Sequence, residues 1–75
     1  MAARDRLVRR SLRERFVVTM RSGEAFEGLL LEVDDRTLVL ADGHVLTGNA
    51  RHAADGLLYL PRLEVAYMQK PEASG

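Results

Sequence analysis

The side chains in this sequence that are best suited to binding are its arginines, and most of them lie near the N-terminus. Residues 1–15 hold six arginines against Asp5 and Glu14, a formal charge of +4, whereas residues 16–75 carry −4. Such an asymmetry is compatible with contact to nucleic acid or to an acidic partner. The alternative is a solvated helix face, or a basic helix that docks on an acidic neighbouring subunit. The six residues are Arg4, Arg6, Arg9, Arg10, Arg13 and Arg15.

A second group of polar residues, Asp34-Asp35-Arg36, lies between two apolar runs. Aspartate tolerates turn geometry and accepts hydrogen bonds from the backbone that follows it. The group therefore predicts a short turn. Adjacent aspartates in a turn are far more often turn formers than a catalytic acid pair.

Other candidate sites are weak. His44 and His52 lie near Asp42 and Asp55, but their spacing matches no recognised metal site, so we expect exposed histidines and no metal. The hydroxyl residues have no histidine and acid partner that would activate a nucleophile. No glycine-rich phosphate motif is present. The sequence therefore predicts neither an enzyme nor a cofactor site.

Length and composition restrict the class of protein. At 75 residues the chain is expected to be one domain with a marginal core, and it contains no cysteine. Extra stability is therefore expected from contacts between subunits rather than from disulfides or thiolate metal sites. No apolar run reaches the roughly 18 residues of a membrane span, and no signal-peptide pattern is present, so we expect a cytoplasmic protein without a membrane partner. Lys70 is the one lysine among eleven basic residues, which indicates a GC-rich genome, such as that of an actinobacterium or its phage.

Two hydrophobic periods divide the chain. Residues 3–14 contain no glycine or proline, and the apolar Val8, Leu12 and Phe16 recur every four residues, which predicts an N-terminal helix. From Phe16 onward the period is two, which predicts a strand that ends at a turn over residues 22–23.

A second strand is predicted from residue 24 to about residue 33, and Gly28 lies inside it. Both faces of this strand are largely apolar, so both are expected to be covered, by the N-terminal helix or by a neighbouring subunit. Glycine inside a strand marks a bulge or a sharp bend, which a small sheet needs in order to close on itself. The remaining predictions are strands at residues 37–41, 57–60 and 65–69, a long polar loop at 42–56, and a flexible tail at 70–75.

This order of one helix and five strands resembles the Sm/LSm superfamily, which includes bacterial Hfq, over most of the chain. Residues 17–40 are similar to the first Sm motif, with the segment FEGLL around Gly28 and the dipeptide VD at the expected spacing. Residues 60–68, LPRLEVAYM, are similar to the second motif in length, with Tyr67 in register. Other small barrels, of the PRC or SH3-like type, are the alternatives.

The resemblance implies a single, mainly β domain, in which a helix at residues 3–14 precedes a strongly bent five-stranded barrel at residues 16–69. Subunits of the family join edge to edge, the fourth strand of one beside the fifth strand of the next, in rings of five to seven. Two short edge strands are suited to such a contact. The residues expected at the subunit interface are Leu58, Tyr59, Leu60, Val65 and Tyr67.

Members of the family hold single-stranded RNA, often rich in uridine, with residues of two turns near the pore of the ring. Here the first turn reads DDRT, in which Asp34 matches the motif and Arg36 stands in place of an aromatic residue. The second turn reads PRLE and keeps one arginine, Arg62, beside an acid. Arginine stacks on bases and binds phosphate. The RNA-binding residues implied are Arg36, Arg62, Asp34 and Thr37 at the turns, and Arg6, Arg9, Arg10 and Arg13 on the predicted helix.

Two functions follow. The first is a non-enzymatic ring that binds single-stranded RNA, which the family and the basic N-terminal segment favour. The second is a ring used for protein interaction or assembly, encoded by a phage for example, without RNA binding. The acidic residues of both turns favour this second function.

Overall fold

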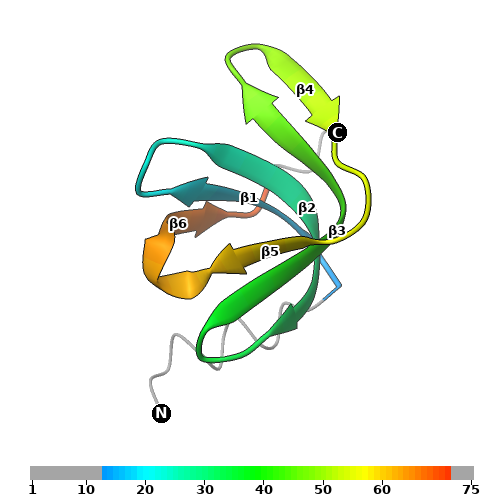
Figure 1. Cartoon of the computed structure of the whole chain (residues 1–75). Helices are drawn as coiled ribbons and strands as arrows, with labels where there is room; N and C mark the ends of the chain where they lie inside the picture. The colour runs from blue at the N-terminus through cyan, green and yellow to red at the C-terminus, as the bar shows by residue number, and fades with distance from the viewer. Residues whose placement is uncertain (1–12, 72–75) are drawn as a thin grey trace.

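The computed structural model describes residues 13–71, which form six antiparallel strands in one curved, open sheet (Figure 1). Neighbouring strands follow the order β4-β3-β2-β1-β6, and β5 pairs with the first part of β3. A single 3-10 turn, η1, connects β5 to β6. The strands are β1 (Arg15–Met20), β2 (Ala25–Val33), β3 (Thr37–Thr47), β4 (Ala50–Ala53), β5 (Leu58–Pro61) and β6 (Val65–Gln69), and η1 spans Arg62–Glu64.

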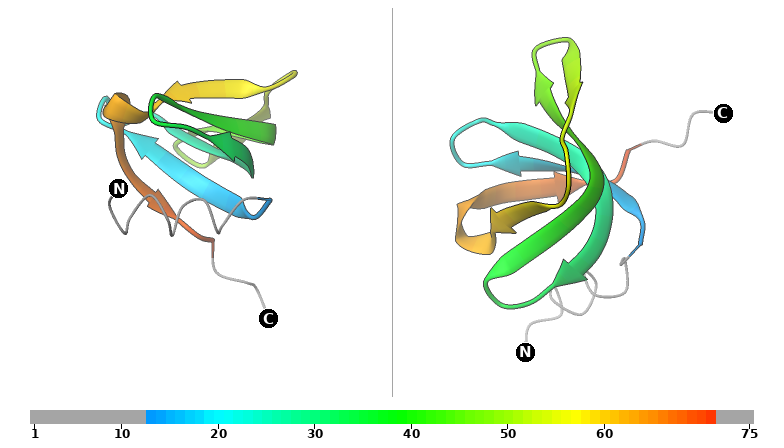
Figure 2. Two further views of the ribbon diagram at one scale, coloured as in Figure 1. Left: turned by 90° about the horizontal axis from the view of Figure 1, so that it is seen from below. Right: turned by 45° about the vertical axis from the view of Figure 1, so that its right-hand side comes forward.

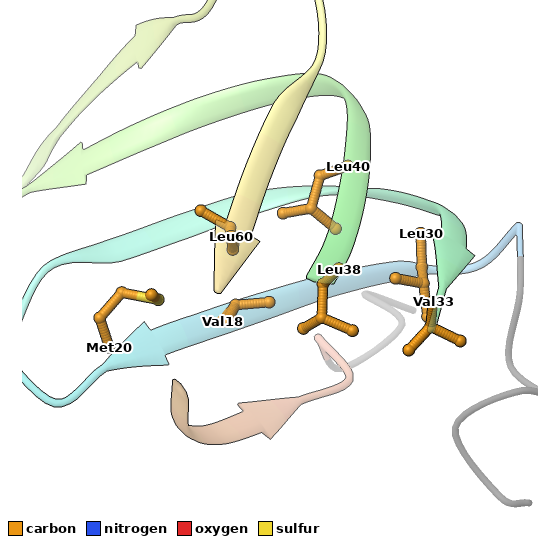
Figure 3. Close-up of a cluster of buried hydrophobic side chains, with 7 residues drawn as sticks. All are labelled: Val18, Met20, Leu30, Val33, Leu38, Leu40 and Leu60. Atoms are coloured by element: carbon orange, nitrogen blue, oxygen red, sulfur yellow. The ribbon is translucent and has the colours of Figure 1, made fainter. Parts of the chain in front are cut away.

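Alternation along the strands sends one set of apolar side chains into the space that the curved sheet encloses (Figure 3). In β1, Val18 and Met20 are buried, whereas Val17 and Thr19 between and before them are half-buried. Among the described residues every buried side chain is apolar, so this core is stabilised by the removal of apolar surface from water. The core cluster consists of Val18, Met20, Leu30, Val33, Leu38, Leu40 and Leu60.

Two glycines allow strands to approach closely as the sheet curves, Gly28 of β2 against β3 and Gly43 of β3 against β5. A Cβ atom at Gly28 would lie 2.9 Å from the Cβ of Leu40, and one at Gly43 would lie 2.7 Å from the Cδ1 of Leu58. Carbon atoms in contact normally lie about 3.5–4.0 Å apart, so larger residues do not fit here without movement. The register of β2 against β3 shifts at Gly28, which confirms the irregularity predicted at this position.

β3 changes partners at this bend. Residues 37–40 lie between β2 and β5, whereas residues 44–47 lie between β2 and β4. The second part of β3 and β4 form a hairpin that projects beyond the rest of the sheet (Figure 2). Its turn has Gly48 at a φ of 58°, a left-handed conformation that two-residue hairpin turns require and glycine adopts easily.

The predicted fold class is wrong in its strand count and in its closure. Residues 13–71 form six strands instead of five, and within this range the sheet is open, with β5 and β6 not paired to each other. The loop predicted at residues 42–56 is also wrong, because this stretch contains the end of β3 and the whole of β4. The residues of β4 are all exposed, so this strand has no apolar face whose alternation would reveal it in the sequence.

The N-terminal helix predicted at residues 3–14 is corrected at its end, where residues 13 and 14 are described. Of its residues 3–14, those up to 12 lie outside the described range, and η1 is the only helical segment between residues 13 and 71. Arg13 and Glu14 instead bond to β2: the Arg13 N–H donates to the Leu30 carbonyl at 2.5 Å, and the Leu30 N–H donates to the Glu14 carbonyl at 2.9 Å. No helix in the described part of the chain is long and apolar enough to cross a membrane.

The C-terminal segment predicted as a flexible tail is described only in its first two residues. There the Lys70 Nζ atom donates to the Glu14 Oε1 at 2.5 Å, which ties the end of β6 to the start of β1. The prediction for the last four residues lies outside the described range.

Candidate nucleic-acid interface

The turn between β2 and β3 is organised by the side chain of Asp34. Its Oδ1 atom accepts hydrogen bonds from the backbone N–H groups of Arg36 and Thr37, each at 2.8 Å. The Asp34 N–H donates to the Thr37 carbonyl at 3.0 Å. Aspartate commonly forms turns in this way, and the turn predicted at residues 34–36 is confirmed.

The same contacts favour the charged form of Asp34. The backbone N–H groups of Arg36 and Thr37 are the largest causes that lower the pKa of this carboxyl from its ordinary value of 3.8. Loss of hydration opposes this effect, and the nearby positive charges of Arg62 and Arg36 lower the pKa further. The turn therefore holds a carboxylate at neutral pH.

Two hydrogen bonds that Arg62 donates join the 3-10 turn η1 to this β2–β3 turn. The Arg62 N–H donates to the Arg36 carbonyl at 2.8 Å, and the Arg62 Nη1 donates to the Asp34 carbonyl at 2.6 Å. These contacts bring together the two turns that the sequence predicted to bind RNA. We call the resulting surface the turn surface; it consists of Asp34, Arg36, Thr37 and Arg62.

The turn surface carries charges of both signs. The side chain of Arg36 is exposed, whereas Arg62 is half-buried against the turn it bonds. Asp35 and Glu64 are exposed beside these arginines. A polyanion approaching this surface therefore meets the exposed side chain of Arg36 together with the carboxylates of Asp34, Asp35 and Glu64.

The basic N-terminal residues are described only in part. Arg6, Arg9 and Arg10 lie outside the described residues. Arg13 is exposed, and its backbone is bonded to β2, the strand that leads into the turn surface.

The residues predicted at a subunit interface fall into two groups. Tyr59 on β5 is 66% exposed and Tyr67 on β6 is 54% exposed. Leu58 and Val65 are half-buried and pack against the core, and Leu60 belongs to the core itself. Within the described residues, β5 pairs with β3 alone and β6 with β1 alone, so one edge of each strand has no strand beside it.

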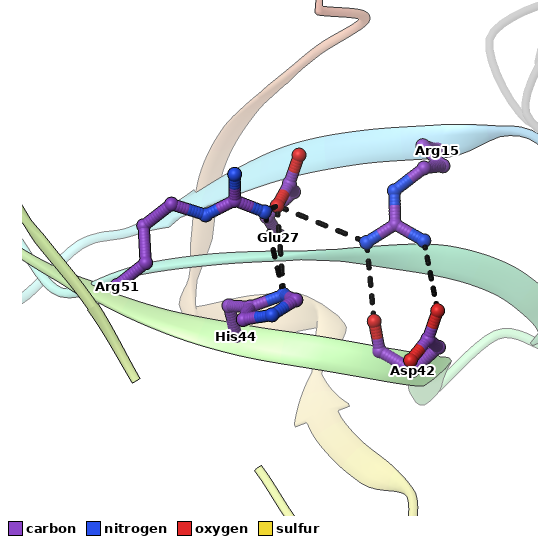
Figure 4. Close-up of polar contacts among 5 residues, drawn as sticks. All are labelled: Arg15, Glu27, Asp42, His44 and Arg51. Atoms are coloured by element: carbon purple, nitrogen blue, oxygen red, sulfur yellow. Dashed lines mark hydrogen bonds and ion pairs between the residues drawn. The ribbon is translucent and has the colours of Figure 1, made fainter. Parts of the chain in front are cut away.

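A charged cluster on the outer side of the sheet was not predicted from the sequence (Figure 4). The Glu27 Oε1 atom contacts the Nη2 of Arg51 and lies 3.7 Å from both the Arg15 Nη2 and the His44 Nδ1. Arg15 also donates to the carbonyl of Asp42 at 3.1 Å. We call these five residues the Glu27 cluster. The available signal was Glu27 itself, an acid with apolar residues on both sides in the segment AFEGLLL.

The two histidines differ in their surroundings. His52 is exposed, as predicted, but His44 is half-buried beside Glu27. The alignment of Glu27 with His44 across β2 and β3 explains this contact. Across residues 13–71, no group of three or more acidic, histidine or cysteine side chains is placed to hold a metal ion.

Comparison with known proteins identifies the fold through structure rather than through sequence. No model of a protein family matches the chain, and no curated protein matches its sequence. The SmAP1 heptamer of Pyrobaculum aerophilum is similar in structure, with a TM-score of 0.87 and 16% identity over 97% of this chain and 99% of that one. An Sm protein of Pyrococcus abyssi, crystallised with a uridine heptamer, gives a TM-score of 0.81 with 22% identity over 95% and 100% of the two chains. This chain has an Sm-like fold.

The Sm-like fold alone does not decide what this chain binds. At 16% and 22% identity these likenesses concern the backbone. A chain in the crystal structure of the NatC complex bound to CoA also matches the Sm-like chain, with a TM-score of 0.75 and 20% identity over 87% of this chain and 84% of that one. Since one fold carries different functions, the function has to be argued from the site.

Proposed function

We propose that this chain forms a homo-oligomeric ring of five to seven subunits that binds single-stranded RNA and has no enzymatic activity. The observation that carries the proposal is the joining of the two turns by Arg62, which gathers the turn surface at one place on each subunit. The Sm protein crystallised with a uridine heptamer supports this function by its similarity in fold.

The ring is proposed from the edges of the sheet. The unpaired edges of β5 and β6 leave backbone donors and acceptors without a neighbouring strand in the described chain, and such edges are suited to pairing with another chain. Tyr59 and Tyr67 are exposed on these strands, and large aromatic residues are enriched at protein interfaces. A contact of β5 with β6 of the next subunit is head-to-tail, so it generates a ring when the rotation closes.

Within the ring, each residue of the turn surface has a separate role in the proposal. Arg36 stacks on a base or binds a phosphate, because its guanidinium group is exposed. Asp34 and Thr37 hold the turn that presents Arg36, and Arg62 fixes η1 against that turn. The N-terminal residues Arg6, Arg9, Arg10 and Arg13 supply further phosphate contacts.

A second candidate is a ring that binds another protein and no RNA. The exposed carboxylates of Asp35 and Glu64 favour it, together with the charged form of Asp34, because all three repel phosphate. The match to a chain of the NatC complex supports this candidate at the level of fold.

The two candidates are separated by measuring assembly and RNA binding on the same sample. The protein is freed of nucleic acid, its subunit number is measured by native mass spectrometry, and its affinity for labelled oligouridine is measured by fluorescence anisotropy at several salt concentrations. For the RNA ring we expect a discrete multimer whose affinity falls steeply as salt increases. A discrete multimer without affinity for oligouridine near physiological salt would favour the protein-binding ring, and a monomer would contradict both.

The variant Arg36→Ala tests the turn surface directly. The hydrogen bonds of Arg36 to Asp34 and Arg62 use its backbone, so the substitution leaves the turn intact. We expect affinity to fall by about tenfold and the salt dependence to weaken by about one phosphate contact. The control Arg51→Ala removes an exposed arginine from the hairpin, beyond the bend of β3, and should bind as the unchanged protein does.

A further inference from the structure

Arg51 ties the hairpin of β3 and β4 to the body of the sheet. It lies on β4, an edge strand that pairs with β3 and whose four residues are all exposed. Its side chain reaches across β3, and the Nη2 atom contacts the Glu27 Oε1 on β2 (Figure 4). β4 buries no side chain of its own, so it depends on this contact in addition to its backbone pairing.

The same Nη2 atom of Arg51 has a second neighbour, the imidazole ring of His44. The Nδ1 atom of His44 lies 3.5 Å from the Arg51 Nη2 and 3.7 Å from the Glu27 Oε1. A guanidinium group only donates hydrogen bonds, so His44 accepts from Arg51 only while its Nδ1 carries no proton. The geometry therefore fits a neutral His44 with its proton on Nε2, and an Arg51 shared between a carboxylate and an imidazole.

A proton on Nδ1 of His44 reverses these roles. Histidine takes up a proton near pH 6.5, about the middle of the physiological range, and the ring then donates from both nitrogens and carries a positive charge. The charged ring repels Arg51 and attracts Glu27, and the two cations compete for one oxygen, the Glu27 Oε1. The side chain of Arg51 is 56% exposed and that of His44 is 27% exposed, so water compensates Arg51 more readily for the loss of its partner.

The other charges that face the ring do not have this freedom. From β1, the Arg15 Nη2 lies 3.7 Å from the Glu27 Oε1 and donates to the Asp42 carbonyl at 3.1 Å. The carboxylate of Asp42, on β3 itself, lies 3.4 Å from the Arg15 Nη1. From β4, the uncharged Ala53 is the residue opposite the imidazole. Arg15 therefore keeps a second partner whichever group Glu27 binds, and Arg51 is the cation that can leave.

We propose that protonation of His44 displaces Arg51 from Glu27 and thereby loosens β4, which makes the hairpin a pH-sensitive part of the sheet. At neutral pH, Arg51 bridges Glu27 and His44 and holds β4 against the sheet. In acid, His44 takes the place of Arg51 beside Glu27, and the guanidinium group turns into solvent. The proposal concerns contacts within one subunit, so it stands or falls independently of RNA binding.

The test is amide hydrogen exchange of the whole protein between about pH 8 and about pH 5, the range in which histidine changes its charge. The known effect of pH on the exchange chemistry is divided out, which leaves the protection that the structure provides. We expect the protection of residues 50–53 to fall about fivefold in acid, the size expected for the loss of an exposed ion pair. The protection of residues 37–40 should not change.

Two histidine variants show which ring is responsible. His44→Gln keeps an uncharged side chain that accepts a hydrogen bond and takes up no proton in this range, so its hairpin should not respond to pH. His52→Gln is the matched control, because it removes the exposed histidine of the same hairpin, which pairs with Val45 instead of contacting Glu27. This variant should respond to pH as the unchanged protein does.

The ring resonances of His44 in the unchanged protein provide a second measurement that needs no substitution. We expect the loss of protection in β4 to have the same midpoint as the titration of His44 by NMR. A different midpoint, or a protection of β4 that stays constant or rises in acid, would overturn the proposal. A pH response that persists in His44→Gln or disappears in His52→Gln would overturn it as well.

Discussion

The two parts of β3 are held in place by different forces. Its first part, residues 37–40, lies between β2 and β5, and three of these four residues are buried. Its second part, residues 44–47, lies between β2 and β4, and none of these residues is buried. One continuous strand thus passes from an apolar core into an exposed hairpin.

The forces change at the bend between the two parts. Leu38 and Leu40 belong to the core cluster, where stability comes from apolar area and close packing. Beyond Gly43, the Glu27 cluster connects β1, β2, β3 and β4 through guanidinium, imidazole and carboxylate groups (Figure 4). Screening by salt weakens contacts between exposed charges and affects apolar packing much less.

We infer that apolar packing stabilises one part of the sheet, whereas contacts between charges, which salt screens, stabilise the other. The turn surface begins the first part, since Thr37 is the first residue of β3. The proposed RNA site is therefore built on the part of the sheet that apolar packing stabilises, whereas the hairpin depends on charge. The following substitutions test that division.

The largest expected effect comes from Leu40→Ala. Leu40 is fully buried, so its truncation should lower the free energy of unfolding by about 2–5 kcal/mol. The matched variant Leu46→Ala changes a half-buried leucine of the second part and should cost only about 1 kcal/mol. Urea denaturation at one fixed protein concentration gives both values, because subunit association also contributes to stability. Equal losses would show that the two parts do not differ in packing.

A smaller effect is expected from Glu27→Gln. The change removes the negative charge at the centre of the Glu27 cluster. The side chain of Glu27 is 15% exposed, but its partners Arg15 and Arg51 are 37% and 56% exposed, so we expect a loss of about 1 kcal/mol, near the upper end for pairs open to solvent. We expect faster amide hydrogen exchange in residues 44–53 of the hairpin and normal exchange in residues 37–40.

The same exchange measurement at high salt tests whether attraction between charges holds the hairpin. If charge attraction holds the hairpin, about 1 M salt should reduce the difference between Glu27→Gln and the unchanged protein. Glu32→Gln is the control, because Glu32 is an exposed acid on the same strand. An identical exchange pattern in both variants would mean that the cluster does not hold the hairpin.

The smallest effect is expected from Asp34→Asn, and it depends on pH. The folded state lowers the pKa of Asp34 below its ordinary value of 3.8. The carboxylate therefore stabilises the folded state at pH values above the pKa that Asp34 has in the unfolded chain. The contribution is lost as the pH falls from about 3.8 through the lowered value in the folded state. The Tm of Asp34→Asn should therefore lie below that of the unchanged protein at neutral pH and approach it in acid.

Asp35→Asn provides the comparison for this experiment, since it removes the adjacent exposed carboxylate without touching the Oδ1 atom that caps the turn. A difference in Tm that stays constant from neutral to acid pH would contradict the assigned role of Asp34. A difference in Tm that is present at neutral pH and disappears in acid would assign the effect to the charge of Asp34.

Local chemistry made much of the fold predictable from the sequence. The alternation from Phe16 onward predicted β1, because period-two burial follows from strand geometry. Gly28 predicted the irregularity in β2, and Asp34 predicted the turn, because both effects act within a few residues. The hairpin of β3 and β4 was not predicted, because all residues of β4 are exposed and the strand therefore shows no alternation of apolar and polar residues.

The residues of the two turns and the positions of most strands follow from local sequence. The contact of Arg62 with Asp34, 28 residues earlier in the chain, and the gathering of Arg15, His44 and Arg51 around Glu27 follow from the folded sheet alone. Contacts between residues far apart in the chain depend on strand register and on the bend of the sheet. Those are properties of the whole packed sheet, so no short segment of sequence encodes them.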